Sequence, residues 1–149
     1  MGRSIHWGII GCGDVAEVKS GPAFHLVANS SLINVTQHNG SKAKDFAERH
    51  QVPHWTDTAQ DIIENKDIDA VYIATRPSSK LSYTLAALAV DKHAYLEKPM
   101  AMDIAEAQQI YDAVALYRRK LPAFLKVKEL LENKPVGSTT LADIKILQP

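Results

Sequence analysis

The sequence predicts an α/β fold in which helices cover both faces of a doubly wound parallel sheet. Short apolar runs with the character of strands alternate along the chain with helical patterns, as expected of βαβ units. The chain has 149 residues, of which 46% are hydrophobic and 23% are charged, and this is enough to bury one hydrophobic core. We therefore expect one sheet-based domain at residues 1–116.

The first strand, at residues 5–10, ends in a glycine-rich turn. The turn and the start of the next helix consist of Gly11, Cys12, Gly13, Asp14, Val15 and Ala16. In a turn of this kind the first glycine bends the chain, the second lets the backbone approach a pyrophosphate, and a small residue such as Ala16 lets the helix pack closely on the strand. The amides at the helix start then hold the phosphates. The turn therefore predicts a Rossmann-type dinucleotide site.

A second strand and two helices are expected next. The strand lies at residues 32–36, and a helix at residues 41–50 ends before Pro53. A shorter helix is expected at residues 57–64, with Asp57 as its N-cap.

The third predicted strand occupies residues 69–74, and a turn at residues 75–79 leads into a helix. That helix carries three leucines at helical spacing, which we expect to face the sheet: Leu81, Leu85 and Leu88. A further strand follows at residues 93–96.

Three motifs, taken in order, carry a resemblance to a known family. They are the glycine-rich turn, the strand Val71-Tyr72-Ile73-Ala74-Thr75 with Pro77 after it, and Glu97-Lys98-Pro99 directly after the last strand. With these motifs the chain resembles the N-terminal half of the Gfo/Idh/MocA oxidoreductases. The resemblance covers nearly the whole chain, and its specificity comes from the ordered combination.

The resemblance implies an enzyme that transfers a hydride between NAD(P) and a sugar, polyol or related alcohol. It places the lysine of the Glu-Lys-Pro motif beside the nicotinamide and the substrate. The residues that it implies at the cofactor, besides those of the turn, are Ala74, Thr75, Arg76, Lys80, Glu97, Lys98 and Pro99.

Lys98 is the predicted catalytic residue. A cation at the carboxyl end of a central strand can hydrogen-bond the substrate hydroxyl and favour the alkoxide character that develops as the hydride leaves. Pro99 restricts the residue before it and can form a cis bond, which would aim Lys98 inward. The alternative is a strand that ends in a solvated Glu-Lys pair.

Gln37 and His38 follow the second strand, where dinucleotide folds read the adenosine ribose. An acid at this position selects NAD, whereas neutral or basic residues leave room for the 2′-phosphate of NADP. Because no acid is present, we expect NADP to be preferred, with NAD possible. The alternative is that both residues are ordinary turn residues.

Arg76 and Lys80 depart from the pattern of the family, which leads us to expect proline or asparagine at 76 and histidine at 80. The two cations either pair with the cofactor phosphates or hinder substrate entry. For Lys80 we expect a third outcome, in which the side chain faces solvent in the first turn of its helix.

After residue 102 the chain is shorter than the family pattern. A helix carrying Ile104, Ala107, Tyr111 and Val114 on one face runs straight into Tyr117-Arg118-Arg119, which in the family follows another strand. Either the sixth strand is lost, or residues that once joined these segments are absent.

Residues 117–149 are expected to be the truncated start of a second domain. A helix is predicted at residues 121–133, and a strand at residues 142–146 has no partner strand after it, which leaves an unpaired edge. In the family the second domain forms the substrate pocket and much of the oligomer interface. We therefore expect this chain to bind dinucleotide but to turn over substrate slowly or not at all, and its unpaired edge can make it sticky or dimeric. An intact form is expected to be a homo-oligomer.

Composition disfavours other classes of function. Seventeen basic residues balance seventeen acidic ones, which argues against nucleic acid, and no apolar run approaches the roughly 20 residues that span a membrane. The six histidines lack metal-ligand spacing, so no metal is expected. With one cysteine, Cys12, and no signal-peptide pattern, we expect a cytoplasmic protein and read Cys12 as a variable turn residue.

The alternative function is a dinucleotide-binding module without catalysis. A Rossmann domain for another nucleotide is disfavoured by the Glu-Lys-Pro motif.

Overall fold

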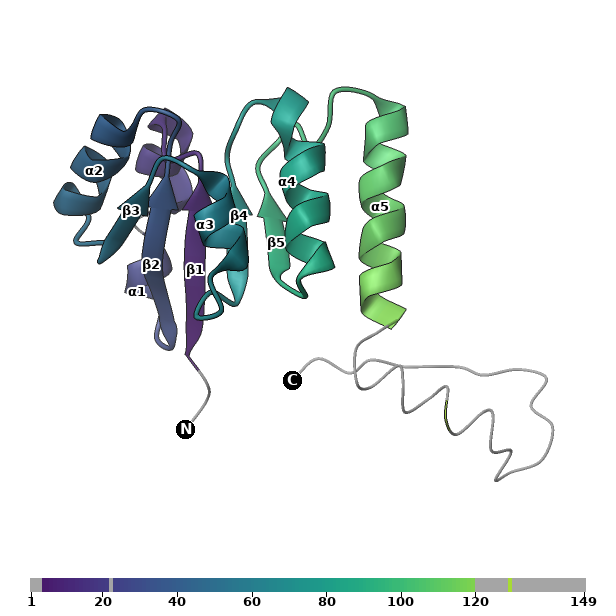
Figure 1. Ribbon diagram of the computed structural model, residues 1–149, viewed down its shortest axis with the longest axis horizontal. Helices are drawn as coiled ribbons and strands as arrows, with labels where there is room; N and C mark the ends of the chain where they lie inside the picture. The colour runs from purple at the N-terminus through teal and green to yellow at the C-terminus, as the bar shows by residue number, and fades with distance from the viewer. Residues whose placement is uncertain (1–3, 22, 120–128, 130–149) are drawn as a thin grey trace. The chain divides into compact units, whose positions relative to one another are not determined.

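A five-stranded parallel sheet forms the centre of the computed structural model, which describes residues 4–21, 23–119 and 129 (Figure 1). The strands are β1 (Ile5–Ile10), β2 (Ser30–Thr36), β3 (His54–Thr56), β4 (Ala70–Ile73) and β5 (His93–Leu96). Their order in the sheet is β3-β2-β1-β4-β5, and every neighbouring pair is parallel. The chain thus winds outward from β1 in one direction and then from β4 in the other, as in a doubly wound sheet.

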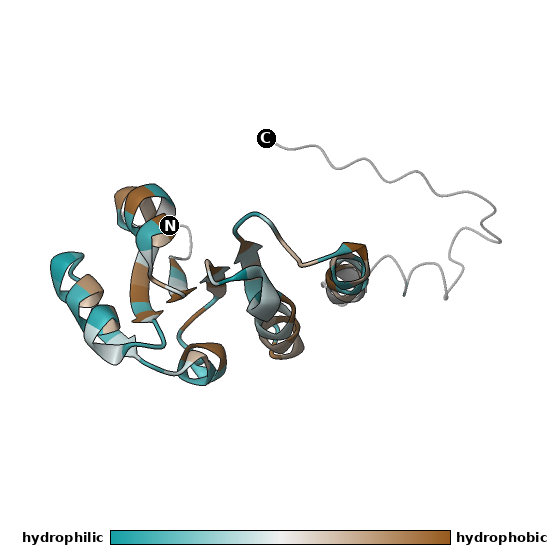
Figure 2. Cartoon of the chain, turned by 90° about the horizontal axis from the view of Figure 1, so that it is seen from above, coloured by the Kyte–Doolittle hydropathy of each residue, from teal (hydrophilic) through white to brown (hydrophobic). Residues whose placement is uncertain are grey.

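Helices cover both faces of the sheet (Figure 2). The covering helices are the π-helix η1 (Ala16–Ser20) and the α-helices α1 (Ala23–Leu26), α2 (Gly40–Arg49), α3 (Ala59–Glu64) and α4 (Pro77–Ala89), and a further helix, α5 (Ile104–Arg119), follows β5. Successive residues of a strand point to opposite faces. Accordingly, Ile9 packs with Phe24 of α1 and Phe46 of α2, whereas its neighbour Ile10 packs with Ile62 of α3.

The predicted elements around α3 need two corrections. β3 was not expected, because its three residues are largely exposed at the sheet edge and show no apolar alternation. α3 begins at Ala59, and its N-cap is Thr58 rather than Asp57. The Thr56 hydroxyl organises this loop by accepting from the Thr58 amide at 3.2 Å and donating to Asp61 Oδ2 at 2.5 Å.

The buried face of α4 is not the one predicted. Leu81, Leu85 and Leu88 are only half-buried, and the fully buried residues of this helix are Lys80, Thr84 and Ala87. The helix carries apolar residues nearly all the way round, so the spacing of its leucines does not determine which side faces the sheet.

The segment before Tyr117, where the family pattern has another strand, belongs to α5. Residues 113–117 lie inside this helix, and the sheet has five strands in the described part of the chain. The chain divides into two compact units, Met1–Val114 and Ala115–Pro149. Apart from residue 129, the predicted helix at 121–133 and the strand at 142–146 lie outside the described residues, so the domain expected at residues 117–149 stays a prediction.

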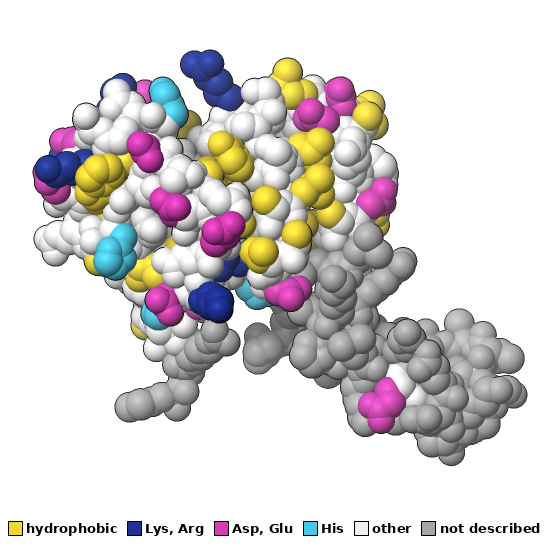
Figure 3. Space-filling model, viewed as in Figure 1, with side chains coloured by type: hydrophobic (Ala, Val, Ile, Leu, Met, Phe, Trp, Pro, Cys, Tyr) yellow, Lys and Arg dark blue, Asp and Glu magenta, His cyan; other side chains and the backbone are white. Residues whose placement is uncertain are grey.

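The face of the molecule in view carries acidic and basic side chains interspersed with apolar ones (Figure 3). Within residues 4–119, apart from position 22, no helix combines the length and the hydropathy that crossing a membrane requires.

Candidate functional site

The carboxyl ends of four strands meet at one edge of the sheet. The amides of Gly11 and Cys12 donate to the carbonyl of Thr36 at 2.9 and 3.0 Å, which joins the ends of β1 and β2. The amide of Ala74 donates to Ile10, and that of Glu97 donates to Ile73, at 2.9 and 3.0 Å. The segments that follow β2, β1, β4 and β5 therefore lie side by side, with the reversal of strand order between β1 and β4, where open α/β sheets bind ligands.

Gly11 makes the bend that the sequence predicts. Its φ is +93°, a backbone conformation that residues with a side chain rarely adopt. A Cβ at this position would also lie 2.9 Å from Cγ2 of Thr75 and 3.1 Å from the carbonyl carbon of Ala74. Glycine is therefore required here by the fold itself.

Gly13 differs, because no contact among the described residues requires it to be glycine. Its φ is not positive, and a Cβ built on it would meet no atom within 4 Å. The turn thus presents bare backbone to open space, which suits a ligand that approaches the main chain closely. Next to it, Asp14 and Val15 are exposed, whereas Ala16 is fully buried in the core.

The helix after the turn is irregular. The amide of Gly21 donates to the carbonyl of Ala16 at 2.8 Å, five residues back, which is the π-helical register. η1 ends at Ser20, and α1 begins at Ala23.

A pocket of about 500 Å³ opens along this edge of the sheet. It brings together seven of the predicted site residues: Gly11, Gly13, Gln37, His38, Ala74, Thr75 and Arg76. The lining residues that sequence reasoning missed are Ile10, Thr36, Asp57, Ala59, Ser78, Ser79 and Tyr83. The volume falls within the range of small-molecule sites, about 300–1,000 Å³.

The other predicted residues do not line this pocket. Lys98 is exposed and follows β5, which is separated from β1 by β4 alone. The peptide bond between Lys98 and Pro99 is cis. Lys98 therefore stands farther along the same edge of the sheet as the pocket.

The expectation that Lys80 faces solvent is wrong. Only 1% of its surface is exposed, and its Nζ donates to the carbonyl oxygens of Glu97 and Pro99, the latter at 2.7 Å. Burial lowers the pKa of Lys80, and the charge of Glu97 opposes this shift. The long aliphatic stem lets the side chain cross the apolar layer before its ammonium finds acceptors. A cation so placed is not available to a cofactor phosphate in the pocket.

Of the two cations predicted near the cofactor, Arg76 and Lys80, only Arg76 lines the pocket. It is exposed and is the N-cap of α4. Its carbonyl accepts hydrogen bonds from the amide and the hydroxyl of Ser79, both at 3.1 Å. The backbone of Arg76 is thus fixed while its guanidinium is free to meet a ligand.

An acidic side chain, that of Asp57, lies beside the loop that follows β2. Gln37 Oε1 accepts from the Asn39 amide at 3.2 Å, and Asn39 caps α2 by accepting from Ser41 at 3.1 Å. Beside this loop, Oδ2 of Asp57 lies 4.0 Å from the place that a Cβ on Gly40 would take. The segment between β3 and α3 thus places a carboxylate in the same pocket as Gln37 and His38.

Cys12 is 5% exposed, and burial raises its pKa to about 11. It is therefore a thiol at neutral pH and packs as a small core residue, rather than standing as a variable residue of the turn. Among the residues described here, His, Cys, Asp and Glu side chains form no group of three or more that could hold a metal ion.

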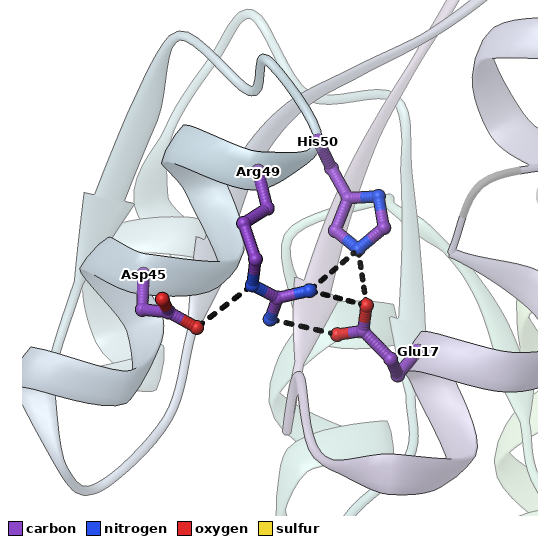
Figure 4. Close-up of polar contacts among 4 residues, drawn as sticks. All are labelled: Glu17, Asp45, Arg49 and His50. Carbon is purple, nitrogen blue, oxygen red and sulfur yellow. Dashed lines mark hydrogen bonds and ion pairs between the residues drawn. The ribbon is translucent and has the colours of Figure 1, made fainter.

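A polar cluster ties the helix after the glycine-rich turn to the end of α2 (Figure 4). Arg49 donates to both carboxylate oxygens of Glu17, at 2.5 and 3.0 Å, and to Asp45 at 2.9 Å. His50 Nε2 lies 2.6 Å from the same Glu17 carboxylate. The hydrogen bonds from Arg49 are the main reason why the pKa of Glu17 falls from 4.5 to about 2.

We predict that Glu17→Gln destabilises the chain at pH 7 by about 1 kcal/mol, a value reduced by solvent screening of this partly exposed pair. Because the pKa of Glu17 is lowered in the folded state, its contribution is complete above 4.5 and is lost as the pH falls toward 2. Urea unfolding from pH 7 to pH 2.5 should therefore show the difference between the variant and the wild type shrinking. Glu48→Gln, which removes an exposed pair with Lys44, is the control and should change little. A Glu17→Gln difference that is constant with pH would contradict the assignment.

Comparison with known proteins gives consistent matches. A family model described as an oxidoreductase family with an NAD-binding Rossmann fold matches residues 5–124. An oxidoreductase of Formosa agariphila is 50% identical over 99% of this chain and 49% of its own length. An inositol 2-dehydrogenase of Acidothermus cellulolyticus is 28% identical over 99% of this chain and 46% of its own. A trans-1,2-dihydrobenzene-1,2-diol dehydrogenase of Danio rerio is 27% identical over 93% and 44%.

The chain spans about half the length of these relatives. The alignment with the Formosa agariphila oxidoreductase extends over 157 positions, whereas this chain has 149 residues, so the relative contains residues without a counterpart here.

Two solved structures show the fold. The 3-ketoreductase of Actinomadura kijaniata, in complex with NADP and TDP-benzene, has a TM-score of 0.72 at 23% identity over 88% of this chain and 43% of its own. The WlbA dehydrogenase of Chromobacterium violaceum, in complex with NADH and UDP-GlcNAcA, has a TM-score of 0.72 at 20% identity over 92% and 42%. The predicted Rossmann-type parallel sheet is confirmed.

Proposed function

This chain belongs to the Gfo/Idh/MocA oxidoreductase family, and from that premise we propose that it is the dinucleotide-binding half of an enzyme that oxidises or reduces a sugar, polyol or related alcohol or aldehyde. The observation that carries the proposal is a single sheet edge that runs from the Gly13 turn, through the pocket, to Lys98. An extended dinucleotide laid along this edge would have its pyrophosphate at the turn and its nicotinamide toward β5.

The residues of the turn and the pocket fit such a cofactor. The open space at Gly13 leaves room for the pyrophosphate against bare backbone, and the first amides of a helix lack intrahelical partners. Gln37, His38 and Arg76 would surround the adenosine ribose. When bound, the nicotinamide supplies the hydride or accepts it.

Lys98 would act on the substrate in this arrangement. Its ammonium would donate to the hydroxyl or carbonyl oxygen of the substrate and stabilise negative charge on that oxygen during hydride transfer. Two relatives are named for a cyclic polyol and for a diol, which favours an alcohol as the substrate class. We further propose that the intact enzyme is a cytoplasmic homo-oligomer, with residues 117–149 opening its second domain.

Hydride transfer is the test of this function. Because this chain alone is expected to turn over substrate slowly or not at all, the intact enzyme, which includes the second domain, is mixed with NADP or NAD and a panel of sugars and polyols, and reduced nicotinamide is followed by absorbance. Substrate-dependent reduction supports the enzyme. Saturable cofactor binding without reduction by any member of the panel would favour the alternative, a dinucleotide-binding module without catalysis.

Asp57 sets a limit on the expected preference for NADP, because its negative charge stands in the same pocket as Gln37 and His38. We predict that Asp57→Asn strengthens binding of NADPH relative to NADH by about fivefold, since it removes repulsion toward the 2′-phosphate. Calorimetric titration with both cofactors measures this ratio. Asp91→Asn, at an exposed turn after α4, is the control and should leave it unchanged. An unchanged ratio in Asp57→Asn would place Asp57 away from the ribose.

A further inference from the structure

Lys80 holds the backbone on both sides of Lys98. It lies in the first turn of α4, and its buried Nζ donates to the carbonyl of Glu97, the residue before Lys98, and to that of Pro99, the residue after it. An ammonium has three donor hydrogens and no acceptor, so two carbonyls that converge on it are fixed relative to each other. The residue between them is fixed with them.

Other contacts anchor the two ends of this arrangement. The amide of Glu97 pairs with Ile73 of β4 at 3.0 Å, and the hydroxyl of Thr84 donates to the carbonyl of Lys80 at 2.6 Å. The Lys98 amide lies 3.2 Å from Glu97 Oε2. The segment that leaves β5 is therefore tied to the sheet through Glu97 and to α4 through Lys80, while the Lys98 side chain stays exposed.

Burying a lysine for this purpose is costly, and a methionine of similar shape would fill the same space without removing a charge from water. The chain uses the same device at one other described place. Lys92 is 6% exposed, and its Nζ donates to the carbonyls of Asn65 and Ile68 at 2.6 and 2.7 Å. Those carbonyls precede β4, at the opposite end of the sheet from Lys98. The two buried lysines thus differ in which segment they hold.

We propose that Lys80 is a positioning residue, whose ammonium clamps the Glu97 and Pro99 carbonyls and so holds Lys98 toward the nicotinamide end of the cofactor site. This inference rests on the proposed function, because it assumes that the nicotinamide lies toward β5. Held at that edge, the Lys98 ammonium can also donate to the hydroxyls of the nicotinamide ribose. The position of Lys98 therefore affects the affinity for the whole cofactor but not for the adenosine half of the cofactor.

The test compares Lys80→Met with Lys92→Met. Hydrogen exchange of residues 97–102 is expected to accelerate about tenfold or more in Lys80→Met and to stay unchanged in Lys92→Met, where residues 65–69 accelerate instead. Calorimetry with NADPH and with adenosine 2′,5′-bisphosphate, which lacks both the nicotinamide and its ribose, adds a second readout. Lys80→Met is expected to weaken NADPH about fivefold while leaving the fragment unchanged. Where Lys80→Met does not fold, Lys80→Gln, which also removes the ammonium, takes its place.

The outcomes separate the inference from the function on which it rests. If wild-type chain binds NADPH and the Lys80 variants lose neither protection at residues 97–102 nor NADPH affinity, the positioning role is overturned and the proposed function stands. Equal weakening of NADPH and of the fragment, or the same losses in Lys92→Met, would reduce Lys80 to general stability. Absence of NADPH binding by folded wild type would instead overturn the proposed function.

Discussion

Replacing Gly13 with alanine is expected to weaken NADPH binding about tenfold, and replacing it with valine about 100-fold, without changing the stability of the fold. The Cβ would enter open space, so no contact within the chain is lost or strained. The same Cβ would stand where a pyrophosphate must approach the backbone. The effect therefore grows with the size of the side chain and falls on the ligand alone.

Calorimetric titration with NADPH and thermal unfolding without ligand measure the two parts of this prediction. The expected pattern is a graded loss of affinity at a constant unfolding temperature. Wild-type affinity in both variants would mean that the dinucleotide does not cross this turn. A fall in the unfolding temperature of Gly13→Ala would mean that this glycine serves the fold instead.

Gly11→Ala is expected to lose both stability and binding. The positive φ and the approach to Ala74 and Thr75 would cost about 2 kcal/mol in the free energy of unfolding. The turn must shift to relieve the contact, and the amides that follow it then leave their positions. Urea unfolding and the NADPH titration should therefore both respond.

Gly40→Ala provides the matched control for Gly11→Ala. A Cβ there would lie 3.4 Å from Cζ3 of Trp55 and 3.6 Å from Cβ of Asp57, close to ordinary contact, and alanine favours a helix start such as that of α2. Its stability should equal or exceed that of wild type. If Gly11→Ala were as stable as Gly40→Ala, the claim that the turn at Gly11 tolerates only glycine would be contradicted.

The strands of the sheet centre could be predicted where they contain a run of apolar residues that is buried on both faces. Ala70–Ile73, for example, is buried at every position. β3 could not, because His54, Trp55 and Thr56 join the sheet at its edge through backbone pairing with β2 and carry no apolar pattern. The buried face of α4 was predicted wrongly because the apolar residues of this helix do not define one face.

Some residues of the candidate site could likewise be predicted from the sequence, and others could not. Motif residues near the strand ends, such as Gly11, Gln37 and Thr75, converge because parallel strands bring their carboxyl ends to one edge. Asp57 lines the pocket because β3, the strand directly before it, pairs with β2. An acidic residue directly after a strand is the sequence signal that could have predicted its place. Lys80 was missed for a different reason, since the partners of its ammonium are backbone carbonyls that no side-chain pattern reveals.

The measurement that tests the central claim most directly is a calorimetric titration of the folded chain, its mass checked against 16.4 kDa, with NADPH and with NADH. The account predicts saturable binding at one site, tighter for NADPH and weakened by Gly13→Val. No binding of either cofactor by folded wild-type chain, or binding that Gly13→Val leaves intact, would contradict it.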